Sequence, residues 1–142
     1  MTTVRHLLGS KKPALFTIGP DAPVLEAVRS MAEHGVGALL VMRGDALAGI
    51  ISERDYARKV VLLGRASADT PIAQIMSSPV VTVSPDTNVQ RCMVFMTERR
   101  IRHLPVVENG RVIGVVSIGD LVKSVIEEQQ RTIEELESYI HG

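Results

Sequence analysis

The chain repeats itself at an offset of 65 residues, and this duplication limits its fold more than any other feature of the sequence. Residues 16–56 align with residues 81–121 without a gap. Eleven of the 41 aligned positions are identical, where composition alone would give roughly two or three. A unit of about 60 residues has too small a core to be comfortably stable alone. We therefore expect two like halves that share a core about a pseudo-two-fold axis.

The most informative identical positions form a short motif that occurs once in each copy. Residues 49–55 read GIISERD and residues 114–120 read GVVSIGD. Each is a glycine, the end of an apolar strand, and then a serine with an aspartate three residues later. Serine is a favoured N-cap and an acid at that spacing completes a capping box, so the motif predicts a strand that leads directly into a helix. Helix capping alone would account for one copy, whereas two copies in register point to a shared function.

Apolar spacing predicts the same order of elements, β-α-β-β-α, in each copy, so the fold class is α/β in the mixed, α+β sense. The first copy should contain a strand at 16–18, a helix at 24–34, strands at 38–42 and 47–51, and a helix from 52 to about 63. The second should contain a strand at 80–83, a helix at 89–97, strands at 103–107 and 112–116, and a helix from 117 to about 140. A short amphipathic piece precedes each copy, at 1–12 and 71–76.

The last predicted helix outruns its counterpart in the first copy. Its apolar residues recur near a seven-residue spacing, with Gln129 as the polar exception: Val122, Ile126, Ile133, Leu136 and Ile140. Such a stripe either packs back on the rest of the chain or pairs with the same helix of a second copy in a homodimer. The seam is too short to decide between these two arrangements.

Composition and residue spacing argue against several classes of protein. The chain has no net charge and no Trp, which opposes nucleic-acid binding through its one basic cluster at 99–102. That cluster is either a solvated face or a phosphate clamp. The single cysteine, Cys92, is expected in the core and fits a cytoplasmic protein. No apolar run or signal-peptide core indicates a membrane segment or export. The histidines lack metal-ligand spacing and no catalytic constellation is present, so we expect neither a metal site nor an enzyme.

Together, the tandem units, the two G-φ-φ-S-x-x-D turns (φ, apolar) and the strand RHLPVV at 102–107 make residues 13–127 resemble a pair of CBS domains. The resemblance implies repeats at 13–64 and 80–127, joined by a linker with a short helix at 65–79. An N-terminal helical segment at 1–12 and a helix extension at 128–142 flank them. The family's ligands are adenosine-containing (AMP, ADP, ATP, NAD(H) or S-adenosylmethionine) and lie in clefts between the repeats.

The resemblance also implies which residues bind the ligand. It assigns the ribose hydroxyls to Asp55 and Asp120, and the phosphate to Ser52 and Ser117. Physical chemistry agrees with the second assignment, since a helix N-terminus exposes N–H groups and the positive end of its dipole. The Arg54 guanidinium can bind a phosphate through two N–H groups, or it can reach the ligand of the other repeat. The second repeat has Ile118 and Gly119 at the matching places, so the two sites are not equivalent.

Further positions follow from the family pattern around adenine. They are Thr17 and Thr82 in the first strand of each repeat, and Gly37, Ala38, Arg102 and His103 at the entries to the second strands. Three of these residues have a plainer interpretation, which is β propensity for the two threonines and a solvent-facing strand end for His103. The resulting hypothesis is a regulatory module, expected to form a homodimer, that binds an adenine nucleotide and signals to an effector protein. The alternative is an interaction scaffold without nucleotide, whose clefts are filled by side chains.

Overall fold

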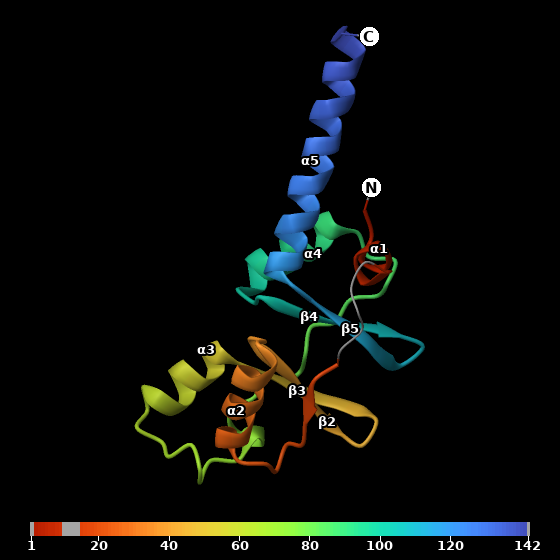
Figure 1. Cartoon of the computed structure of the whole chain (residues 1–142). Coiled ribbons are helices and arrows are strands. Elements are labelled where there is room, and N and C mark those ends of the chain that lie inside the picture. Colours follow the sequence, from red (N-terminus) through yellow and green to blue (C-terminus); the bar gives the residue numbers. More distant parts are fainter. Residues whose placement is uncertain (1, 10–14, 142) are drawn as a thin grey trace. The chain divides into compact units, whose positions relative to one another are not determined.

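A computed structural model describes residues 2–9 and 15–141 of the chain (Figure 1). The chain forms two compact units. We call the first the repeat-1 unit; it comprises Ala14–Val81 with Gly110–Val112. We call the second the repeat-2 unit; it comprises Met1–Pro13, Thr82–Asn109 and Ile113–Gly142. The segment that precedes the first repeat in sequence therefore belongs to the unit that holds the second repeat.

The repeat-1 unit is built on a three-stranded sheet in the order β1-β2-β3. Strand β1 (Thr17–Ile18) pairs in parallel with β2 (Ala38–Arg43), and β2 pairs antiparallel with β3 (Ala46–Ser52). Helix α2 (Val24–His34) joins β1 to β2 and has the predicted bounds. Its apolar spacing places Val24, Ala27 and Met31 in the core, and Gly35 ends it in the left-handed conformation that glycine adopts readily.

After β3 the chain turns directly into helix, as the motif predicts. The first turn is α3 (Glu53–Tyr56), and the helix continues as a π-helical segment (Ala57–Val61) that ends two residues before the predicted limit. A 3-10 turn (Ile72–Gln74) then packs its Ile72 side chain into the core of the same unit. Ser77 follows it and exchanges backbone hydrogen bonds with Ile50, so the linker adds itself to the edge of β3.

The repeat-2 unit contains α4 (Val89–Arg99), β4 (His103–Glu108) and the long helix α5 (Ile118–His141). Strand β5 (Arg111–Ser117) forms a hairpin with β4, and its residues from Ile113 on belong to this unit. Helix α1 (Val4–Gly9) completes it. The N–H of Val4 donates to Thr87 O at 2.8 Å and the Val4 side chain is fully buried, which ties this N-terminal helix to the unit. The predicted piece at 1–12 lies within the described residues only as far as Gly9.

One predicted strand is wrong. Residues 80–83 form no strand, and only Val83 bridges to Val106 in parallel. In the first repeat, the N–H of Leu40 donates to Phe16 O at 3.1 Å and extends the ladder to β1. The position equivalent to Leu40, 65 residues on, is Pro105, which has no N–H to donate. The ladder therefore stops at Val83, and Thr82 lies outside any strand.

Candidate functional site

The strand-to-helix turn of the first repeat is a complete capping box. Ser52 Oγ accepts from the N–H of Asp55 at 3.2 Å, and Asp55 Oδ2 accepts from the N–H of Ser52 at 3.0 Å. The Ser52 hydroxyl also donates to Asp55 Oδ2 at 3.0 Å. The sequence therefore predicted this cap correctly. The Ser52 hydroxyl both donates and accepts within its own motif, and one of its two acceptor lone pairs remains.

The other carboxylate oxygen of Asp55 is engaged as well. Asp55 Oδ1 accepts from Ser77 Oγ at 3.2 Å and lies 3.1 Å from Lys59 Nζ, which also donates to Ile75 O at 2.9 Å. The Asp55 side chain is only 11% exposed, whereas that of Lys59 is 41% exposed. A buried carboxylate requires such partners, because leaving it unpaired would cost several kcal/mol. Asp55 therefore joins β3, α3 and the 72–77 segment of its unit.

The remaining predicted residues of the first repeat lie around this turn. The N–H of Glu53 donates to Gly37 O at 3.1 Å, and Ala38 is paired with Ser52 across β2 and β3. The strand entry and the motif are thus neighbours, as the family pattern implies. Thr17 is exposed in β1 and is paired with Leu40, two residues further along β2 than Ala38. Arg54 is half-buried in the first turn of α3.

The turn of the second repeat reproduces the cap. Asp120 Oδ2 accepts from the N–H of Ser117 at 2.8 Å, and Ser117 Oγ accepts from the N–H of Asp120 at 3.2 Å. The N–H of Ile118 donates to Arg102 O at 2.9 Å, which matches the bond from Glu53 to Gly37. His103 is half-buried as the first residue of β4. Thr82 is exposed and lies before α4 in the chain, whereas the other predicted residues of this repeat lie at the start of β4 and at the turn from β5 to α5.

The 65-residue offset between the repeats reveals one difference in the surroundings of the two aspartates. The residue four places after Asp55 is Lys59, and the residue four places after Asp120 is Ser124. Ser124 is buried in α5 and carries no charge. The position that supplies an ammonium group to Asp55 in the first repeat therefore supplies a serine in the second. The 65-residue offset identifies this pair, although it lies just beyond the aligned ranges 16–56 and 81–121.

The glycine that opens each motif lies against another segment of its own unit. A Cβ on Gly49 would stand 2.6 Å from Met76 Sδ and 3.0 Å from the backbone O of Ser77. A Cβ on Gly114 would stand 2.6 Å from Leu8 Cδ2. The glycines are thus required for close approach of the linker to β3 and of α1 to β5. The sequence motif gave no signal of these two contacts.

Both helix N-termini are partly satisfied by protein atoms. In each first turn, the N–H of the first residue bonds to the strand entry and the N–H of the third bonds to the capping serine. These are two of the groups that a phosphate would otherwise bind at a helix N-terminus. The second residues are Arg54 and Gly119, which differ in size and charge. The two first turns therefore differ at their second residue, which is an arginine in one repeat and a glycine in the other.

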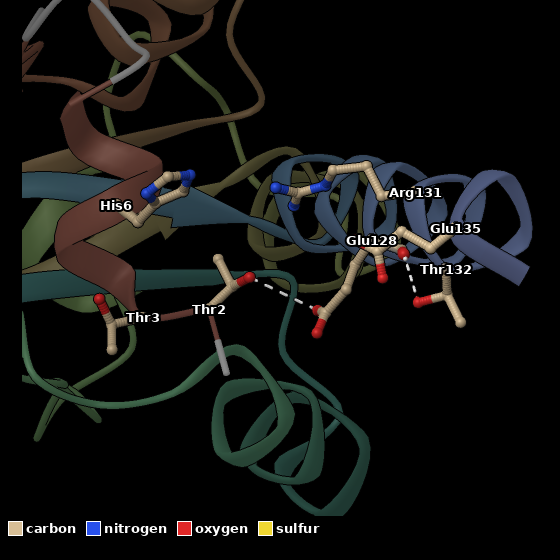
Figure 2. A pocket seen from close by; sticks show the side chains of 7 residues that line it. All are labelled: Thr2, Thr3, His6, Glu128, Arg131, Thr132 and Glu135. Atoms are coloured by element: carbon tan, nitrogen blue, oxygen red, sulfur yellow. Dashed lines mark hydrogen bonds between the residues drawn. The ribbon is translucent and has the colours of Figure 1, made fainter. Parts of the chain in front are cut away.

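An open pocket of about 440 Å³ lies elsewhere in the repeat-2 unit, and it was not predicted from the sequence. Figure 2 shows its walls, the N-terminal segment with α1 on one side and α5 on the other. Its lining residues are Thr2, Thr3, His6, Glu128, Arg131, Thr132 and Glu135. Thr2 Oγ1 donates to Glu128 Oε2 at 3.4 Å across it. The pocket carries both signs of charge, and it contains none of the predicted site residues.

The other side chains singled out in the sequence have structural surroundings. Cys92 is buried in the repeat-2 unit, and burial raises the pKa of its thiol. The basic cluster Arg99, Arg100 and Arg102 is exposed around the end of α4, with Arg100 at φ 53° in the left-handed region. Within residues 2–9 and 15–141, no group of three or more His, Cys, Asp or Glu side chains is arranged to hold a metal ion. Every helix in those ranges is too short or too polar to cross a membrane.

Comparison with known proteins agrees with the duplicated fold. The model of the CBS domain matches this chain twice, at residues 4–62 and 72–127. The Arabidopsis thaliana protein CBSX3, a mitochondrial CBS domain-containing protein, is 46% identical over 127 residues. The match covers 86% of this chain and 62% of that protein, so this chain spans less than two thirds of its relative.

Solved structures show the same architecture. A CBS-domain protein from Burkholderia ambifaria MC40-6 is 50% identical, with a TM-score of 0.87 over 90% of this chain and 96% of that one. The CBS pair of MJ0100, solved with 5-methylthioadenosine and S-adenosyl-L-methionine, is 24% identical. It has a TM-score of 0.80 over 90% of this chain and 98% of its own, which shows a shared fold. CBS pairs are regulatory modules of signal transduction, and by both repeats this chain belongs to the CBS-domain family.

Proposed function

We propose that this chain binds an adenosine-containing ligand (AMP, ADP, ATP or NAD(H)) at its two Ser-x-x-Asp turns and signals to a partner protein. The observation that carries the proposal is the matching geometry of the turns. Each has the same serine–aspartate cap, and each first helical N–H bonds to the residue that precedes a strand, Gly37 or Arg102. A ligand that recognises one turn would therefore meet a similar arrangement at the other.

In this proposal the carboxylates of Asp55 and Asp120 accept hydrogen bonds from ribose hydroxyls. Ser52, Ser117 and the helix N-termini face the phosphate, helped by the guanidinium of Arg54. The adenine ring lies against the strand entries and first strands, where the residues are Thr17, Gly37, Ala38, Thr82, Arg102 and His103. Ligand binding would favour one arrangement of the module over others, and a partner protein would respond to that shift in population.

The contacts of Asp55 constrain how a ligand could bind at the first turn. A ribose there would have to share the carboxylate with Lys59 and replace the hydrogen bond from Ser77. The MJ0100 complex supports the ligand class, because that protein has the same fold and holds two adenosine compounds.

Isothermal titration tests the proposal directly. The full chain, freed of bound small molecules by unfolding and refolding, is titrated separately with AMP, ATP and NADH. We expect saturable heat with at least one of them. The matched control is Asp45→Asn, because Asp45 is an exposed acid at the β2–β3 turn. Absence of heat with all three ligands would contradict the proposal, as would equal binding of adenosine-free phosphates.

A second candidate function, an interaction scaffold without nucleotide, is favoured by the exposed apolar residues of α5. In that case the partner protein would bind to the chain irrespective of nucleotide. A chain that ends at Glu127 separates the two functions. Loss of partner binding with intact nucleotide binding would assign the partner to α5, and retention of both self-association and partner binding would contradict the scaffold.

A further inference from the structure

The second half of α5 presents apolar side chains that the described part of the chain does not cover. Every residue from Gln129 to His141 is exposed. Among them Ile133 is 48% exposed, Leu136 57% and Ile140 74%, and Ile126 just before them is 59% exposed. Figure 1 shows this half of α5 extending past α4 and α1 of its own unit. An apolar surface of this kind on a helix indicates a partner.

The spacing of these residues is that of a coiled-coil seam. Steps of four and three residues alternate without exception along Val122, Ile126, Gln129, Ile133, Leu136 and Ile140. In the heptad lettering a to g, Ile126, Ile133 and Ile140 occupy the "a" positions. The d positions are Val122, Gln129 and Leu136. A seam with this repeat fits another helix of the same repeat, and α5 itself supplies one.

The seam lies on a different side of α5 from the side that packs on the unit. Leu121 and Ser124 are the buried residues of α5, and Thr132 and Glu135 face the N-terminal segment across the pocket. At 100° per residue, the average direction of the seam is about 120° away from that of these inward residues. A second helix can therefore lie along the seam without displacing α4 or α1.

The charged residues beside the seam decide which way the second helix runs. Lys123 and Glu137 are both e positions. In a parallel pair an e position lies beside a g position, so Lys123 would face Ile118 and Glu137 would face Thr132. In an antiparallel pair e lies beside e. If Val122 is level with Ile140 of the partner subunit, then Lys123 lies beside Glu137 of the partner subunit, and symmetry repeats this ion pair.

The same antiparallel register accounts for the rest of the seam. Ile126 is level with Leu136 of the partner subunit, and Gln129 with Ile133 of the partner subunit. On the g side, Val125 lies beside Tyr139 of the partner subunit, which would cover a ring that is 87% exposed in the single chain. We infer that α5 is the docking surface for a second copy of this chain, joined through an antiparallel pair of α5 helices. This inference does not depend on nucleotide binding.

The first experiment measures self-association of the full chain by sedimentation equilibrium. We expect a dimer whose dissociation constant rises by at least about tenfold in Ile133→Glu, because that variant places a charge in the centre of the seam. The control is Ser138→Glu, which makes the same addition on the opposite side of an exposed helix. Circular dichroism verifies that both variants keep their helix. A chain that stays monomeric, or a dimer that Ile133→Glu leaves unchanged, would overturn the inference.

The second experiment tests the direction of the pair. Lys123→Glu and Glu137→Lys should each weaken the dimer several-fold, and the double variant should restore it, because the two charges are exchanged together. For cross-linking, Ile126→Cys and Leu136→Cys chains are mixed and oxidised. The antiparallel register predicts disulfides between the two kinds of chain and few within Ile126→Cys alone. Efficient cross-linking of Ile126→Cys to itself would show a parallel pair and overturn the register.

Discussion

The two Ser-x-x-Asp turns have the same cap and different surroundings. Both aspartates accept from the backbone of their capping serine, at 3.0 Å in the first repeat and 2.8 Å in the second. Asp55 is in addition bonded to Ser77 and paired with Lys59, whereas the place of Lys59 in the second repeat is taken by Ser124. Duplication thus preserved the local turn, and divergence acted on the residues around it. In the first repeat, Asp55 also links the turn from β3 to α3 with the 72–77 segment of its unit.

The largest difference between the repeats is expected in stability. Asp55→Ala removes the partner of the Lys59 ammonium and of three other donors, so it should lower the free energy of unfolding by about 3 kcal/mol. Asp120→Ala removes the same kind of cap, which usually contributes about 1 kcal/mol, but its helix has Ser124 in the place of Lys59, so we expect a smaller loss than for Asp55→Ala. Urea unfolding measures both, with the exposed Asp45→Ala as control. Equal losses in the two repeats would contradict the structural role of Asp55.

A smaller difference is expected at the glycines of the motif. In Gly49→Ala the new methyl meets the backbone O of Ser77 at 3.0 Å as well as the Met76 side chain, so we expect a loss of about 2 kcal/mol. In Gly114→Ala the neighbours are side-chain atoms of Leu8 on a short helix, which can shift, so the loss should be about 1 kcal/mol. Urea midpoints give the comparison. The reverse order would show that α1 is held more firmly than the linker.

The ion pair itself should contribute less than the whole Asp55 network. Lys59→Met keeps most of the side chain's apolar length but removes the ammonium. Because Lys59 is 41% exposed, water screens the pair, and we expect a loss of only about 1 kcal/mol. Thermal unfolding at low and high salt measures it, and Arg58→Met, at an exposed neighbouring position, serves as the control. A loss as large as that of Asp55→Ala would mean that the pair, and not the hydrogen bonds, dominates.

The smallest effect is expected where the repeats differ in the core. Cys92 occupies the place of Ala27, and both are fully buried. Burial raises the pKa of the Cys92 thiol, so the folded state holds its proton to higher pH than the unfolded state. The stabilisation that this provides is complete below the ordinary thiol pKa and declines as the pH rises through the raised value. Cys92→Ala should flatten this decline in alkaline unfolding curves, and an unchanged curve would assign the decline to other groups.

Local patterns predicted most of the fold because each repeat is built from short, strongly patterned elements. The helix at Val24–His34 and the start of the helix after Ser52 follow from apolar spacing and capping alone. The strand at 80–83 failed because β propensity was considered without its neighbour, Pro105, which cannot donate the bond that the ladder needs. The π-helical turn after Tyr56 has no pattern that distinguishes it from ordinary helix.

The two serine–aspartate caps were predictable from the sequence, whereas the other partners of Asp55 were not. The motif itself names Ser52, Asp55, Ser117 and Asp120, and the structure confirms their caps. Nothing in the motif shows that Ser77 reaches Asp55, because 22 residues separate them and only the folded linker brings them together. For the same reason the contact of Leu8 with Gly114 was missed. Contacts distant in sequence depend on packing, which periodicity does not encode.

The most direct test of the account is a titration that compares one turn with the other. Ligand-free full chain and its Asp120→Asn variant are titrated with whichever of AMP, ATP or NADH binds the unsubstituted chain. We expect the variant to lose about tenfold or more in affinity at one site while its free energy of unfolding changes by about 1 kcal/mol or less. Unchanged affinity in Asp120→Asn, or no heat with any of the three nucleotides, would contradict the proposal that these turns bind an adenosine ligand.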